Sequence, residues 1–100
     1  MDKEILKNAI NLFGKENQII VAIEELSELQ KELTKYYRNG GSVCHIAEEI
    51  ADVEIMLEQL KIIFPVSPII ESYKIVKVQR LKESCEEYAL ELLIDENDRS

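Results

Sequence analysis

The chain has 100 residues, which suffices for a single domain over residues 1–100 and is too short for separate catalytic and binding modules. Hydrophobic residues make up 46% of it and charged residues 32%, which excludes an intrinsically disordered chain and a membrane-spanning one. The net charge of −8 argues against a basic patch for a nucleic-acid backbone. We therefore expect partners that include neither a nucleic acid nor a membrane.

The cysteines and the N-terminus carry little information about special chemistry. Cys44 and Cys85 are far apart and lack a C-x-x-C spacing, which disfavours a disulfide framework and a zinc site. The apolar runs are only a few residues long, and the N-terminus does not read as a signal peptide. A cytoplasmic location is therefore expected.

Glycine and proline divide the sequence into four predicted helices, and no segment alternates like a β-strand. The first helix is predicted over about 2–13, where apolar residues recur at helical spacing, and Gly14 ends it as the residue after the cap. The second is predicted over about 16–38 and is followed by the Asn39-Gly40-Gly41 turn.

The third helix is predicted to follow Ser42 as its N-cap and to end at Phe64, just before Pro65. Its apolar positions occupy almost the whole circumference, which indicates burial on several sides. A bundle of this size has difficulty supplying that much cover, so we expect a homo-oligomer rather than a monomer with a central helix. The apolar positions are Ile46, Ile50, Val53 and Leu57 on one side, Met56, Leu60 and Ile63 on another, and Ala51, Ile55 and Ile62 on a third.

The fourth helix is predicted to have Ser67 as its N-cap and Pro68 at its first helical position, where the fixed φ of proline fits. It is predicted to continue to about Leu93, with a frayed tail over 95–100.

Two pairs of acids in the second and third helices suggest a metal site. Glu25 and Glu28 form the first pair, and Glu49 and Asp52 form the second. The i, i+3 spacing places both carboxylates of a pair on one face of a helix. A short connection makes the helices antiparallel, with the pairs about 17 Å and about 11 Å from the turn, an offset of about one helical turn. Such pairs on facing helices can surround a hard cation such as Mg²⁺ with oxygen ligands.

Solvated acids on a charged helix surface are the ordinary alternative, and we prefer it for Glu24 and Glu48. Glu49 and Asp52 instead share a sector of the third helix with apolar residues, where acids are informative. Two carboxylates about 4 Å apart repel by about 4 kcal/mol at an effective dielectric of 20. A cluster of this kind is therefore expected where protons or cations neutralise it.

A di-iron carboxylate site is the main metal-binding competitor on a helical bundle. It uses E-x-x-H motifs on two helices, whereas the single histidine of this chain, His45, has Ser42 three positions before it. We expect His45 to cap or pack near the start of the third helix, and a di-iron site is disfavoured.

The acidic constellation resembles that of the MazG-like all-α nucleoside triphosphate pyrophosphohydrolases. The likeness rests on the E-E-x-x-E motif at 24–28, on the E-x-x-D motif at 49–52, and on Gly14 and Gln18 ahead of them. It covers the chain from Gly14 to Arg80. The resemblance implies a four-helix bundle that forms homodimers or homotetramers. It also implies hydrolysis of a nucleoside triphosphate to the monophosphate and pyrophosphate with Mg²⁺, or with Mn²⁺ as a substitute.

The resemblance further implies roles for individual residues. The expected metal ligands are Glu25, Glu28, Glu49 and Asp52. A glutamate that the metal does not saturate would act as the general base, and Glu24 and Glu28 are the candidates. The expected substrate-binding residues are Lys74, Lys77, Arg80 and Gln18. Relatives often use an aromatic residue after the first motif in the base pocket; this chain has no tryptophan, so Tyr36 and Tyr37 either take that place or serve in packing.

Two other functions stay open on the sequence. Phosphoribosyl-ATP pyrophosphatase activity is a competing substrate class within the same superfamily. A non-catalytic helical module for oligomerisation or regulation is the alternative from a different class, and the intact acids argue against it.

Overall fold

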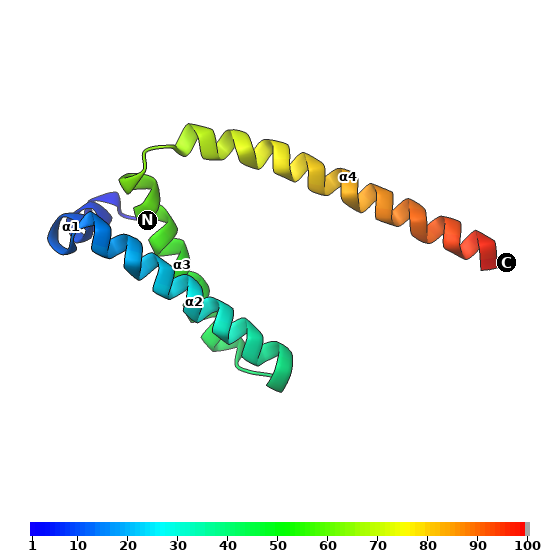
Figure 1. Cartoon of the computed structure of the whole chain (residues 1–100), viewed down its shortest axis with the longest axis horizontal. Coiled ribbons are helices and arrows are strands. Elements are labelled where there is room, and N and C mark those ends of the chain that lie inside the picture. The colour runs from blue at the N-terminus through cyan, green and yellow to red at the C-terminus, as the bar shows by residue number, and fades with distance from the viewer. Residues whose placement is uncertain (100) are drawn as a thin grey trace. The chain divides into compact units, whose positions relative to one another are not determined.

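The computed structural model describes residues 1–99, and its regular elements in that range are all α-helices (Figure 1). They are α1 (Lys3–Phe13), α2 (Lys15–Asn39), α3 (Val43–Ile63) and α4 (Ser67–Arg99). The predicted all-α class is confirmed. The chain divides into two units: α1, α2 and α3 form the first, up to Pro65, and α4 lies in the second, from Val66 onward.

Capping groups define the ends of α1 and the start of α2. The Asp2 carboxylate accepts a hydrogen bond from the Glu4 N–H at 2.9 Å, so Asp2 is the N-cap of α1 rather than its first helical residue. Gly14 separates the two helices with a φ of 94°, a backbone conformation that favours glycine, and its N–H bonds the Ile10 carbonyl at 2.9 Å. The predicted break at Gly14 is confirmed.

The turn between α2 and α3 is short and tightly held. Gly40 is left-handed, with a φ of 66°, and its N–H bonds the Tyr36 carbonyl at 3.0 Å. The Ser42 hydroxyl accepts from the His45 N–H at 3.3 Å, which confirms Ser42 as the N-cap of α3. A three-residue connection makes α2 and α3 antiparallel neighbours.

The boundaries of α4 differ from those predicted. The Val66 carbonyl accepts the Ile70 N–H at 3.0 Å, so the helix begins at Ser67, one residue early. The expected fraying of 95–99 is wrong, because α4 continues to Arg99. This segment contains no glycine or proline, and Arg99 complements the negative helix end. Ser100, the last residue of the expected tail, lies outside the described residues.

The first unit has a small core. Among residues 1–99, the buried apolar side chains are Leu6 of α1, Ala22 of α2, and Val53 and Met56 of α3. α3 nevertheless keeps apolar surface exposed: Leu57 is 44% and Ile50 is 42% exposed. Its apolar circumference is thus partly covered within the described chain, and the homo-oligomer that would cover the rest stays a prediction. No helix in the described range has the length and apolar character to cross a membrane.

Candidate metal centre

A buried amide pair sets the register between α2 and α3. The side chains of Gln18 and Gln59 are buried, and Gln18 Nε2 donates a hydrogen bond to Gln59 Oε1 at 2.7 Å. Glu25 follows Gln18 by seven residues, and Asp52 precedes Gln59 by seven. Seven residues make about two helical turns, or about 10.5 Å. Because the helices are antiparallel, the register that joins the two amides also places Glu25 opposite Asp52.

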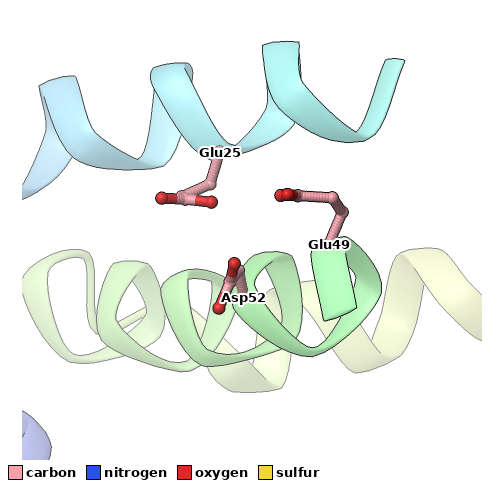
Figure 2. A group of neighbouring side chains, drawn as sticks. All are labelled: Glu25, Glu49 and Asp52. Carbon is pink, nitrogen blue, oxygen red and sulfur yellow. The ribbon is translucent and has the colours of Figure 1, made fainter. Parts of the chain in front are cut away.

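Three carboxylates converge two turns from the amide pair. Glu25, Glu49 and Asp52 each contribute one carboxylate oxygen to a group whose members all lie within 4.8 Å of one another. Figure 2 shows Glu25 extending from α2, and Glu49 and Asp52 extending from α3, with their carboxyl groups close together. All three residues are partly buried.

One oxygen of the cluster has no neutralising contact in the described structure. Glu49 Oε2 is buried and lacks a hydrogen-bond partner among residues 1–99. A buried carboxylate oxygen without a donor is costly, because it has lost water without gaining a substitute. A proton or a cation would satisfy it.

The pKa of Glu25 is raised above its usual value. Partial burial is the largest cause, followed by the negative charges of Asp52 and Glu49, a side-chain hydrogen bond with Asp52, and the charge of Glu28. Each of these causes disfavours a negative charge on Glu25, so a proton or a cation beside it would lower the electrostatic cost of the cluster.

The pKa of Glu49 is raised as well. Burial is again the largest cause, and the charge of Asp52 comes next, ahead of Glu28, Glu48 and Glu32. Glu49 and Glu25 thus share Asp52 as their leading charged neighbour. A proton or a cation that neutralises Asp52 would therefore reduce the electrostatic repulsion on both glutamates.

The donor set fits a hard divalent cation. All three ligand atoms are oxygens, which Mg²⁺ and Mn²⁺ prefer over nitrogen or sulfur. An octahedral ion with bonds of 2.0–2.1 Å separates two ligands by at most about 4.2 Å. Neighbouring ligands of such an ion are about 2.9 Å apart, so the three oxygens, which lie within 4.8 Å of one another, would move closer together to share one ion. Three protein carboxylates leave further positions for water or phosphate oxygens.

The neighbouring acids Glu28, Glu24 and Glu48 are not among the residues whose carboxylate oxygens lie within 4.8 Å of one another. Each of these side chains is exposed. The charge of Glu28 acts on both Glu25 and Glu49, so it lies near them. The structure therefore brings together three of the four predicted ligands and keeps the fourth in the surroundings.

The other predicted site residues have different environments. Gln18 is buried and engaged with Gln59, so its amide is not on the surface of the first unit. Lys74, Lys77 and Arg80 lie on α4 and are exposed, and Lys74 forms an ion pair with Glu71 at 3.3 Å. The substrate-binding roles of all four stay predictions.

Gln59 is the residue that sequence reasoning missed. The indication was available, because Gln59 lies two turns after Asp52 on the same face, among apolar residues. Gln18 lies in the equivalent position before Glu25. A matched pair of polar residues in two apolar sectors predicts a hydrogen bond across the interface.

Comparisons with protein-family models, with curated proteins and with solved structures found no match to this chain. The resemblance to the MazG-like pyrophosphohydrolases rests on the quoted motifs and stays a prediction.

Proposed function

We propose that this protein is a Mg²⁺-dependent hydrolase of a nucleoside triphosphate, producing the monophosphate and pyrophosphate. The observation that supports the proposal is the convergence of Glu25, Glu49 and Asp52, with a buried oxygen of Glu49 left without a partner in residues 1–99. An acidic protein of net charge −8 repels a triphosphate, so cations are needed to bring the two together.

In this proposal the three clustered carboxylates hold the cation. A bound Mg²⁺ supplies charge neutralisation for phosphate oxygens and lowers the pKa of a coordinated water. Glu25 and Glu49 have raised pKa values because of burial and of Asp52. Cation binding therefore displaces protons that these residues retain more strongly than ordinary glutamates do.

A neighbouring carboxylate acts as the general base. Glu28 is exposed, and its charge acts on the cluster, so it can accept a proton at its edge. Glu24 is the second candidate and is also exposed. Arg80 and Lys77 are the proposed phosphate contacts, and neither forms an ion pair within residues 1–99. A homodimer or homotetramer completes the proposed enzyme.

Pyrophosphate release from a panel of ribo- and deoxyribonucleoside triphosphates tests this proposal. We expect hydrolysis that requires Mg²⁺ or Mn²⁺, is lost in Glu49→Gln, and survives in the matched control Glu54→Gln, since Glu54 is an exposed acid of α3 outside the cluster. Failure of every nucleotide to release pyrophosphate, with the cation shown to bind, would refute the activity while leaving the metal site in place.

A further inference from the structure

The middle of α4 carries an apolar stripe that is exposed in the described structure. Every residue from Glu71 to Arg99 is exposed. Apolar residues recur there at alternating spacings of three and four, which is the pattern of a two-stranded helix pair. The stripe consists of Val78, Leu81, Cys85, Tyr88 and Leu92. Its large members Leu81, Tyr88 and Leu92 are 63%, 64% and 48% exposed.

The charge on α4 is polarised along its length. The stretch 71–82 contains four basic residues and one acid, whereas 83–99 contains seven acids and one base. Two copies of such a helix attract each other when they run in opposite directions and repel when they run in the same direction. The charge pattern therefore favours a second copy of the helix in the opposite orientation.

We propose that α4 pairs with α4 of a second copy of this chain in antiparallel orientation through this stripe. In heptad notation Val78, Cys85 and Leu92 occupy a positions, and Leu81 and Tyr88 occupy d positions. In an antiparallel pair each a position lies against a d position of the partner helix. The register that places Leu81 against Cys85 of the partner subunit also places Val78 against Tyr88 of the partner subunit. Over the stripe this register places no acid between the helices, and Leu92 lies against Lys74 of the partner subunit.

The residues that flank the stripe discriminate between the two orientations. Antiparallel pairing brings Lys77 beside Glu91 of the partner subunit, twice by symmetry, and its one unfavourable contact is between the two copies of Lys82. Lys82 Nζ forms an ion pair with Glu86 Oε1 of its own helix at 3.9 Å, which weakens the repulsion between the two lysines. Parallel pairing instead places Lys77 beside Lys82 and Glu91 beside Glu96, so both of its charged flanking contacts are repulsive.

This arrangement separates the roles of two basic residues that the sequence grouped together. Lys77 flanks the stripe, so the contact between copies would compete with its proposed role as a phosphate contact. Arg80 lies further from the stripe and stays available for phosphate. The pairing itself does not depend on the proposed hydrolase activity, and its tests require no nucleotide.

Disulfide formation in the 100-residue chain tests the register. In a Cys44→Ser background, Leu81→Cys places a thiol against Cys85 of the partner subunit, and we expect oxidation to yield a covalent dimer. The Cys44→Ser background alone should stay monomeric on a non-reducing gel, because the two copies of Cys85 are offset by about 6 Å along the helices. A covalent dimer in that background would indicate parallel pairing and overturn the proposal. Absence of one in both proteins would overturn it too.

Charge exchange provides a second test that leaves the apolar stripe intact. We expect Lys77→Glu to weaken self-association by roughly three- to tenfold in sedimentation equilibrium, since two ion pairs become two repulsions. Adding Glu91→Lys should restore it. The matched control adds Glu83→Lys instead, which gives the same net charge with the lysine on the opposite side of the helix, and it should stay weak. Tighter association of Lys77→Glu, or equal association of all variants, would overturn the proposal.

Discussion

Replacing Gln59 with leucine removes one partner of the buried amide pair and leaves the other behind. Gln18 would then retain a buried amide without its 2.7 Å hydrogen bond. An unsatisfied buried polar group costs about 1–3 kcal/mol, more than the net contribution of the bond itself. For a chain of about this length, 1 kcal/mol lowers the melting temperature by about 4–8 °C. We therefore expect Gln59→Leu to melt at least several degrees below the wild type.

The double variant Gln18→Leu with Gln59→Leu separates the hydrogen bond from the packing. Both polar groups are then removed together, so the free energy of unfolding should return to near the wild-type value. Urea unfolding of the four proteins, at one protein concentration, gives the coupling energy of the pair. A single variant as stable as the wild type, or additive losses in the double, would refute the reasoning.

The amide pair should also affect the metal site at a distance of two helical turns. Because it sets the register that places Glu25 opposite Asp52, the double variant should bind Mg²⁺ more weakly even where its stability is restored. A single buried polar residue is known to fix helix register in this way at a cost in stability. Isothermal titration with Mg²⁺ measures it, and wild-type affinity in the double variant would show that apolar packing alone fixes the register.

Three further outcomes are expected. Without divalent cations, the raised pKa values of Glu25 and Glu49 mean that the folded state holds protons more strongly than the unfolded state, so stability falls as pH rises above about 4.5. Glu49→Gln should flatten this fall in urea unfolding with a chelator, and parallel curves for the two proteins would contradict it. Arg80→Ala should raise the Michaelis constant or lower turnover at unchanged melting temperature, and wild-type kinetics would place the phosphates elsewhere. Gly40→Ala should destabilise by about 1 kcal/mol through its φ of 66° alone, since a Cβ there meets no atom within 4 Å; an unchanged midpoint in urea would show that the turn relaxes.

Local features of the sequence predicted the helix ends well. The helix ends at Gly14, Gly40 and Ser42 depend on interactions with residues nearby in the sequence. They can therefore be predicted without knowledge of the tertiary structure. The continuation of α4 through 95–99 differs from the expected frayed tail, and the absence of glycine and proline in this segment is the local feature that favours it.

The meeting of the acids was partly predictable. The i, i+3 pairs and the short turn between α2 and α3 indicated that the two helices present carboxylates to each other. The rotation of each helix about its own axis depends on packing, which the spacing does not fix. That rotation places Glu25, Glu49 and Asp52 together and leaves Glu28 exposed beside them.

The burial of Gln59 could not be read from its own helix alone. A glutamine in an apolar sector is costly by itself, and its acceptability depends on Gln18, a residue 41 positions away. The sequence feature that indicates the pairing is the equal seven-residue spacing from Gln18 to Glu25 and from Asp52 to Gln59.

Thermal unfolding with and without Mg²⁺ tests the central claim, that Glu25, Glu49 and Asp52 form a divalent-cation site. A ligand present at 100 times its dissociation constant stabilises the folded state by about 2.7 kcal/mol, so the wild type should gain about 10–20 °C under those conditions. Asp52→Asn should match or exceed the wild type without the cation, because it relieves repulsion, and should lose most of the gain with it. The control Glu54→Gln should keep the full gain. A wild type whose melting temperature does not respond to Mg²⁺, or an Asp52→Asn variant that responds as fully as the control, would contradict the metal site.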